Sequence, residues 1–419
     1  MKTRTLAFVC AALTLIPGMA RADVVLDWNA IMVRLVQDQP PPNMNRFAAI
    51  TQLAVFEAVN TVTGEYRPYL GTSTPARAAS ADAAAVTAAH RVLRHYFPDR
   101  AAVLDDARAR SLASIPNGPA KVNGISVGED AAAQMIAARS NDGADSPESY
   151  LPPSTQPGQW QLTPDCPSTG GFFLHWRKVT PFAIRRADQF RSEPPPALKG
   201  WRYTRDYNEV KNVGARDSNE RPESRANVAR LYAAVGDAVL WNHVATQLAA
   251  ARRSSLSQNA RTLALLNMAL SDAGVAVMDT KYHYNVWRPE TAIHEAASDA
   301  NERTEPDPSY EPFIVAPCFP SYPSGHASTS YAAREVLERI FGSRGHSVVV
   351  SSAAEPGLTL KYTRLKEITS DIDDARIYGG IHFRFDQEGG AEQGRNVGSY
   401  VYANWLRPGR DCTCDNTRD

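Results

Sequence analysis

The sequence predicts a mostly α-helical protein, a large helical bundle built in two halves. Apolar residues recur three and four positions apart through much of the chain, the spacing of one helix face. Several of these stretches are rich in alanine, which has the highest intrinsic helix propensity. Runs with the pattern of a β-strand are scarce. With 419 residues, of which 43% are hydrophobic, the chain is long enough for two helical halves around a sizeable interior.

Five helices are expected in the first half, at 27–36, 44–60, 79–96, 100–115 and 121–140. We expect Pro40, Pro41 and Pro42 to separate the first two, because proline has no N–H to donate inside a helix. A long break rich in proline and glycine follows at 141–196. It also contains five of the larger aromatic residues, which disordered segments lack: Trp160, Phe172, Phe173, Trp176 and Phe182. We expect an ordered covering segment that closes an N-terminal half at 23–196.

Helical patterns resume at 198–213, 224–252 and 258–288. The last two are expected to pair antiparallel through a turn at 253–257. Residues 347–352 form a brief β-like run. These elements belong to a C-terminal half at 197–419, which also carries the candidate site.

The first 22 residues have the features of a secretory signal peptide. Lys2 and Arg4 precede an apolar stretch, and an A-x-A-like cleavage site ends at Ala22. The alternative is a short N-terminal anchor, for which the apolar stretch is too brief. We expect cleavage before Asp23 and a secreted or periplasmic protein with no membrane span after processing.

Charge and cysteine content narrow the class of partner and the compartment. The formal net charge is zero, so we expect no nucleic-acid partner. Four cysteines follow the signal peptide, namely Cys166, Cys318, Cys412 and Cys414. Disulfides are expected in an oxidising compartment, but sequence alone cannot assign the pairing. For the two tail cysteines, a bridge to Cys166 or Cys318 is favoured over a metal-ligand pair.

Three short segments of the second half together supply three cations, two histidines and a glycine-flanked serine. They are Lys281 to Pro289 (KYHYNVWRP), Pro320 to Ser328 (PSYPSGHAS) and Arg376 to Asp386 (RIYGGIHFRFD). Fixed positive charge, hydrogen-bond donors and imidazoles suit a tetrahedral oxoanion. If the segments meet in space, they predict an enzyme that processes an anion.

In the first segment, Lys281 and Arg288 are seven residues apart and are expected to share one helix face. Arg288 precedes Pro289, so we expect the helix to end or kink there. Taken alone, the pair is also compatible with a solvated surface helix.

In the second segment, Ser324 and Gly325 are expected to begin a helix, whose free N–H groups attract anions. His326 would stand in the first turn. By itself the segment is also compatible with an ordinary N-cap.

The third segment separates Arg376 from His382 by six residues, which a straight helix would place on diverging faces. Gly379 and Gly380 permit a bend between them. Asp386, four residues after His382, is expected to accept a hydrogen bond from the imidazole and fix its tautomer.

Together, K-x6-RP, PSGH and R-x5-H-x3-D, in this order, resemble the signature of the vanadium-dependent haloperoxidases. That family shares its fold and anion site with bacterial acid phosphatases and lipid phosphatases. The resemblance implies a double helical bundle and a vanadate cofactor. It also implies that the oxygens of vanadate are held by Lys281, Arg288, Ser324, Gly325 and Arg376. His382 would be the ligand of vanadium, or the nucleophile in a phosphatase, and His326 the acid/base group.

The local sequence favours the peroxidase. GIHFRFD is similar to the GVHWRFD-type segment of fungal vanadium chloroperoxidase, and Phe319 falls where that enzyme has phenylalanine. Ala375 departs from the pattern, since a serine commonly precedes the arginine. The reactants implied are hydrogen peroxide, a halide and, as a further reactant, an organic acceptor. An acid phosphatase acting through a phosphohistidine and a non-catalytic oxoanion-binding protein remain alternatives. The halide, the organic substrate and the oligomeric state stay open.

A few polar residues near these segments are weaker candidates. Asp237 and Asp272 are candidate partners for the cations, and His283, Glu290 and His294 could support the site, although structural roles are favoured for the last three.

Overall fold

The computed structural model describes residues 23–71 and 74–409. The expected signal peptide at 1–22 and the cysteines Cys412 and Cys414 lie outside the described residues. Within the described ranges the chain forms α-helices and one two-stranded sheet. The predicted fold class is therefore confirmed.

The first five helices agree with the predicted ones to within a few residues at each end, apart from the proline run. They are α1 (Val24–Val36), α2 (Pro41–Thr63), α3 (Ala81–Tyr96), α4 (Ala101–Ala113) and α5 (Pro119–Arg139). Pro41 and Pro42 form the first turn of α2, where a missing N–H costs no intrahelical hydrogen bond. The expectation that all three prolines separate two helices was wrong.

The later helices are α6 (Trp201–Gly214), α7 (Glu223–Ala234), α8 (Asp237–Arg252), α9 (Leu256–Tyr284), α10 (Pro289–His294), α11 (Gly325–Phe341), α12 (Leu365–Tyr378) and α13 (Arg384–Asn404). The single helix predicted at 224–252 was wrong, because Val235 and Gly236 are extended and divide it into α7 and α8. A Cβ at Gly236 would lie 2.5 Å from the Met44 side chain of α2. Glycine therefore allows α2 to pack closely against the connection between α7 and α8.

The strands β1 (Val348–Ser351) and β2 (Thr359–Tyr362) pair antiparallel, with Val348 opposite Tyr362. β1 matches the predicted β-like run, whereas β2 was not predicted. The Gln247 side chain of α8 accepts the Val349 N–H at 2.9 Å and donates to its carbonyl at 2.9 Å. The hairpin is thereby attached to the helical core.

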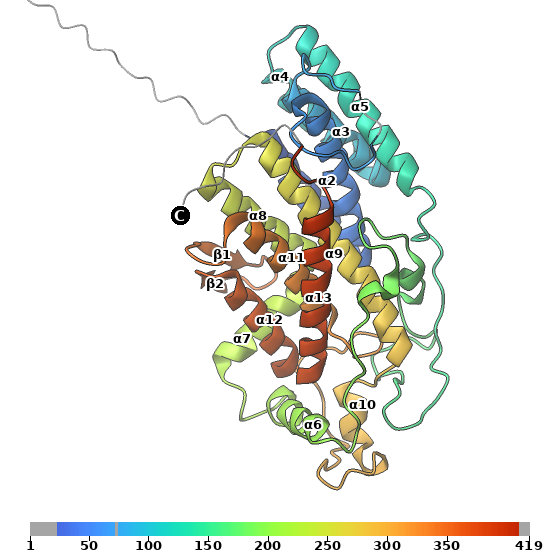
Figure 1. The fold of residues 1–419 in the computed structure, drawn as a ribbon. Coiled ribbons are helices and arrows are strands. Elements are labelled where there is room, and N and C mark those ends of the chain that lie inside the picture. Colours follow the sequence, from blue (N-terminus) through green and yellow to red (C-terminus); the bar gives the residue numbers. More distant parts are fainter. Residues whose placement is uncertain (1–22, 72–73, 410–419) are drawn as a thin grey trace, which may run out of the picture.

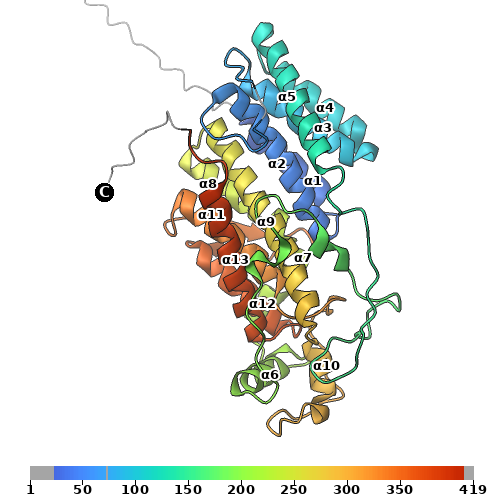
Figure 2. The same ribbon diagram turned by 45° about the vertical axis from the view of Figure 1, so that its right-hand side comes forward.

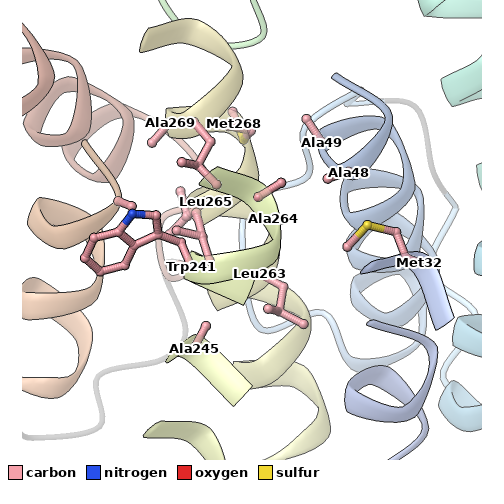
Figure 3. Close-up of a cluster of buried hydrophobic side chains, with 14 of the residues drawn as sticks. Met32, Ala48, Ala49, Trp241, Ala245, Leu263, Ala264, Leu265, Met268 and Ala269 are labelled. Carbon is pink, nitrogen blue, oxygen red and sulfur yellow. The ribbon is translucent and has the colours of Figure 1, made fainter. Parts of the chain in front are cut away.

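Helix α9 runs through the middle of the molecule, and α6 and α10 lie at one end (Figure 1). The helices α1 to α5 lie to one side of α9, and α8, α11 and α12 lie to the other, in both views (Figure 2). Figure 3 shows residues of α9, such as Leu263 and Ala264, between Met32 and Ala48 on one side and Trp241 of α8 on the other. One buried hydrophobic cluster thus joins elements of both predicted halves.

Helix α9 is long and apolar enough to cross a membrane, by length and composition only, although the sequence analysis found no such segment. Its most apolar window is 94% buried inside the fold. The apolar composition of α9 is accounted for by its central position in the core.

The segment between α5 and α6 covers α9, as expected, and contains the 3₁₀ helices Leu174–Lys178 and Ala187–Phe190. Asp272 of α9 accepts hydrogen bonds from three successive N–H groups of this segment, beginning at Phe182, at 2.6 to 2.8 Å. Cys166 of the segment forms a disulfide with Cys318. The expectation that a tail cysteine bridges to Cys166 or Cys318 was therefore wrong, because Cys166 and Cys318 are paired with each other.

Candidate oxoanion site

The first predicted segment places its two cations on either side of a helix end. Helix α9 ends at Tyr284, and Asn285 adopts a left-handed conformation with φ of 53°. Arg288 is extended, with φ of −82° and ψ of 157°, and stands at the N-cap of α10. The prediction that Lys281 and Arg288 share a face of one helix was wrong. The prediction that Arg288 lies at the tip of an element, before Pro289, is confirmed.

Both cations nevertheless hold the same stretch of chain, residues 319–321. The Lys281 Nζ donates to the carbonyl oxygens of Pro320 and Ser321, each at 2.7 Å. The Arg288 Nε donates to the Phe319 carbonyl at 2.9 Å. Lys281 and Arg288 are both fully buried. An ammonium group has three N–H donors, so Lys281 keeps one for a further acceptor.

The second predicted segment begins α11, as expected. Ser324 is the N-cap, and its Oγ accepts the Ala327 N–H. The Ser324 N–H donates to the Asp386 carbonyl at 2.9 Å, which joins the start of α11 to the start of α13. A Cβ at Gly325 would meet no atom within 4 Å, so space remains beside this helix start. His326 follows in the first turn and is partly exposed.

The third predicted segment turns between two helices. Arg376 lies in the last turn of α12, and its side chain donates to the Tyr232 carbonyl at 3.1 Å. Gly380 has φ of 80°, a conformation that favours glycine. His382 lies in the connection that follows, before α13 begins. The predicted bend at the two glycines is confirmed.

His382 is 3% exposed and is held at both ring nitrogens. Its Nδ1 lies 2.8 Å from the Asp386 Oδ2, as predicted, and its Nε2 lies 3.1 Å from Nη1 of Arg288. Because an ionised carboxylate can only accept a hydrogen bond, we assign the ring hydrogen to Nδ1, which leaves the Nε2 lone pair on the side of the cations. Ser321 donates its hydroxyl to the same Asp386 oxygen at 2.5 Å. Sequence reasoning missed Ser321, because its role depends on a contact across 65 residues.

The three cations Lys281, Arg288 and Arg376 act on both imidazoles. Burial lowers the pKa of His382 well below its usual value, and the charges of the three cations lower it further. Burial and the same cations lower the pKa of His326 in the same way. Burial also lowers the pKa of Arg288 to about 9 and that of Arg376 to about 10. The five groups therefore share one region, whose positive charge no single carboxylate balances.

The donors of this region include two that are unused. Within the described residues, Nη2 of Arg288 and Nε of Arg376 are buried and have no hydrogen-bond partner. A buried unpaired donor costs about 1–3 kcal/mol. A tetrahedral oxoanion would satisfy both and would offset the crowded charge, so the donor set fits vanadate or phosphate. We call the following residues the cradle: Lys281, Arg288, Ser324, Gly325, His326, Arg376 and His382.

Two neighbours complete the surroundings of the cradle. Asp237 at the start of α8 is buried, and its charge partly opposes the lowering of the Arg376 pKa by burial. Burial raises the pKa of Asp237 itself to about 7. The sequence had indicated Asp237 only as a weak candidate. The Phe319 ring lies 5.1 Å from Nζ of Lys281 and 5.0 Å from Cζ of Arg288, within range of a cation–π attraction.

Other weak candidates have structural contacts elsewhere. The His294 Nε2 lies 2.7 Å from the Tyr310 carbonyl, and Asp272 holds the covering segment. Across residues 23–71 and 74–409 there is no group of three or more His, Cys, Asp and Glu that could hold a metal ion. The site depends on hydrogen-bond donors and one available imidazole rather than on a cluster of metal ligands.

Comparisons with known proteins identify similar folds. Residues 261–408 match the family model of the VCPO second helical-bundle domain. The fold is similar to that of a bacterial vanadium-dependent iodoperoxidase, with a TM-score of 0.77 and 25% identity over 92% of this chain and 96% of the other. It is also similar to the holo form of a bacterial vanadium-dependent chloroperoxidase, with a TM-score of 0.69 and 17% identity over 87% and 91% of the two chains. Comparison with curated proteins finds no match.

Proposed function

We propose that the chain is a vanadium-dependent haloperoxidase, which oxidises a halide with hydrogen peroxide at a vanadate held by the cradle. The observation that supports this most is the orientation of His382. Its Nδ1 is bonded to Asp386, and its Nε2 lies among the cations, 3.1 Å from Arg288. That is the arrangement a ligand to an oxoanion's central atom requires.

Each residue of the cradle has a distinct part in this proposal. Arg288 and Arg376 would bind vanadate oxygens through the donors that have no partner within the described protein. The remaining N–H of Lys281 and the N–H groups at the start of α11 would bind the others. His382 would bind vanadium through Nε2. Vanadate, when bound, supplies a Lewis acid that activates peroxide toward halide without changing its own oxidation state.

Three side chains would control charge and protons. His326, partly exposed at the start of α11, would exchange protons with the bound oxygens, because its pKa rises when an anion offsets the neighbouring cations. Lys281 would withdraw charge through its free N–H. Asp386 keeps the Nδ1 proton of His382 in place, which preserves the lone pair of Nε2.

An acid phosphatase using the same cradle is the second candidate. The observation that favours it is the same pair, because a neutral Nε2 backed by a carboxylate is also a nucleophile for phosphorus. The donor set fits phosphate as well as it fits vanadate.

The two functions are separated by assays on one preparation of purified protein. We expect vanadate-treated protein to oxidise iodide or bromide in the presence of peroxide, and to hydrolyse p-nitrophenyl phosphate slowly or not at all. Phosphatase turnover that vanadate inhibits, without halide oxidation under any condition, would contradict the proposal. A parent protein inactive in both assays, whose oxoanion affinity is unchanged in His382→Ala, would favour a non-catalytic binding protein.

We also propose that the protein is exported, to the periplasm or beyond the cell. The Cys166–Cys318 disulfide supports this, since disulfides persist in oxidising compartments. Determination of the N-terminus of the protein recovered from the periplasm or medium tests it. We expect the chain to begin at Asp23, and an intact N-terminus on cytoplasmic protein would contradict export.

A further inference from the structure

A second site lies at the end of the helical bundle remote from the cradle. It is a hollow of about 750 Å³, lined by the last turns of α8, α11 and α13 and the first turns of α9. The cradle instead takes the end of α9 and the starts of α11 and α13. Arg261 of the hollow and Lys281 of the cradle lie on the same helix, about 30 Å apart at 1.5 Å per residue. The two sites share no residue.

The hollow is lined by four arginines, Arg252, Arg261, Arg339 and Arg407, and by no acidic residue of the described chain. Arg339 is paired with Glu335 of the same helix, at 2.7 Å. Within residues 23–71 and 74–409, the other three arginines form no ion pair with a carboxylate. The formal net charge of the whole chain is zero, so this excess of positive charge is local.

Two of the guanidinium groups are held in place by backbone carbonyls. The Arg261 Nε donates to the Leu406 carbonyl at 2.7 Å, and Nη2 of Arg252 donates to the Phe341 carbonyl at 3.0 Å. The Arg261 Cζ also lies 5.4 Å from the ring centroid of Tyr402, within range of a cation–π attraction. Because a guanidinium group has five N–H donors, both arginines retain donors for a further acceptor.

A purely structural role for these arginines is to offset the carbonyl ends of helices. Each helix end carries about half an elementary charge. Three carbonyl ends border the hollow, those of α8, α11 and α13, and the positive end of α9 opposes them. Three guanidinium groups that have no carboxylate partner in the described chain exceed what these ends offset. The remaining charge attracts anions, because a hollow lined by one sign of charge concentrates counter-ions.

We propose that the hollow binds a small organic molecule that carries several phosphate or carboxylate groups. The planar fork of arginine binds two oxygens of such a group together, and several arginines favour a ligand with more than one group. The volume of about 750 Å³ is that of a small-molecule site. The inference is independent of the proposed function, because it requires neither vanadate nor catalysis.

Calorimetric titration of the full chain with defined probes tests the inference. Inositol hexakisphosphate supplies phosphate groups, citrate supplies carboxylates, and myo-inositol is the uncharged control. We expect one molecule of at least one polyanion to bind per chain, with an affinity that falls as salt is added, and myo-inositol not to bind. The polyanion that binds more tightly identifies the anionic group that the hollow recognises.

A pair of double variants locates the binding. Arg252→Gln, Arg407→Gln removes two charges from the hollow at exposed side chains. We expect the affinity for the polyanion to fall about 10-fold or more, the effect of losing one charge-assisted hydrogen bond. Arg34→Gln, Arg110→Gln is the matched control, because it makes the same change in net charge at exposed residues of α1 and α4, outside the hollow. Its affinity should equal that of the parent.

Two results would overturn the inference. One is a parent protein that binds neither polyanion. The other is equal affinity in the two double variants, which would place the probe elsewhere, for example at the cradle. Polyanion binding that depends on Arg252 and Arg407 in a protein without halide oxidation would instead support the hollow and contradict the proposed function.

Discussion

At the scale of single residues, Ser321 connects Lys281 of the cradle with Asp386, the partner of His382. Its carbonyl accepts from Lys281 at 2.7 Å, and its hydroxyl donates to the oxygen of Asp386 that also accepts from His382. Because the other Asp386 oxygen, Oδ1, is buried without a partner, the carboxylate depends on these donors. Ser321 is therefore a positioning residue for His382.

We predict that Ser321→Ala weakens vanadate binding roughly 10-fold, the usual effect of removing a partner behind a metal-ligating histidine. Equilibrium binding to the unreacted protein is the measurement. Ser321→Thr keeps the hydroxyl and serves as the control, with an affinity near that of the parent. Equal affinity in Ser321→Ala and the parent would contradict the positioning role of Ser321.

His326 carries a pH prediction whose sign follows from its surroundings. Burial and the three cations hold the pKa of its imidazole well below the usual value in the free protein, so it is neutral at pH 7. A bound anion offsets those charges and raises the pKa, so binding takes up a proton and the affinity increases as pH falls.

The affinity for inorganic phosphate should therefore fall more steeply between pH 6 and 8 in the parent than in His326→Ala. Calorimetric titration at several pH values measures both, and the difference between the two proteins cancels the titration of phosphate itself. Parallel curves would mean that His326 does not gain a proton when the anion binds.

At the scale of elements, the turn between α12 and α13 sets the direction of His382. Gly380 has φ of 80°, and a Cβ there would collide with the Gly214 carbonyl of α6 and lie 2.7 Å from the Tyr310 hydroxyl. α6 can approach this turn only because both positions are glycine.

We predict that Gly380→Ala lowers the free energy of unfolding by more than about 2 kcal/mol, from the left-handed conformation and the collision together. Gly274→Ala is the control, since its Cβ would meet no atom within 4 Å inside helix α9. That substitution should raise stability by about 0.5–1 kcal/mol. Denaturant unfolding measures both, and equal effects would contradict the packing described here.

Local features of these elements could be predicted from the sequence. Ser324 as an N-cap, the bend at Gly380 and the spacing from His382 to Asp386 each depend on neighbours within a few residues. The prediction that Lys281 and Arg288 share a helix face was wrong, because the helix ends at Asn285 in a left-handed conformation, before the end at Arg288 that Pro289 had indicated. Helix ends are decided in part by tertiary contacts, here the hydrogen bond from Tyr150 to Asn285 at 2.9 Å.

At the scale of the whole molecule, the disulfide joins the covering segment to the chain beside the cradle, across 152 residues. Closing so long a loop restricts the unfolded chain, by about 4–5 kcal/mol in the chain-entropy account. We predict that the double variant Cys166→Ser, Cys318→Ser has a melting temperature clearly below that of the parent. Reduction of the parent should reproduce the loss, and a reductant should not affect the double variant. A parent unchanged by reduction would contradict a stabilising bridge.

The contacts between distant segments that assemble the site could not be predicted from the sequence. Asp237 influences Arg376 from 139 positions away, and Cys166 meets Cys318, because α9 and the helices around it bring these segments together. No local pattern encodes such pairings. The meeting of three separate segments was expected from a family resemblance, whereas the missed residue Ser321 belongs to none of the resembling positions.

The central claim, that His382 holds the central atom of an oxoanion within a cradle of three cations, is tested most directly by vanadate binding to the parent and to His382→Ala. We predict one vanadate per parent chain, and an affinity at least about 10-fold weaker in the variant, whose thermal unfolding should otherwise show a folded protein. Equal affinity and stoichiometry in a folded His382→Ala protein would contradict the account.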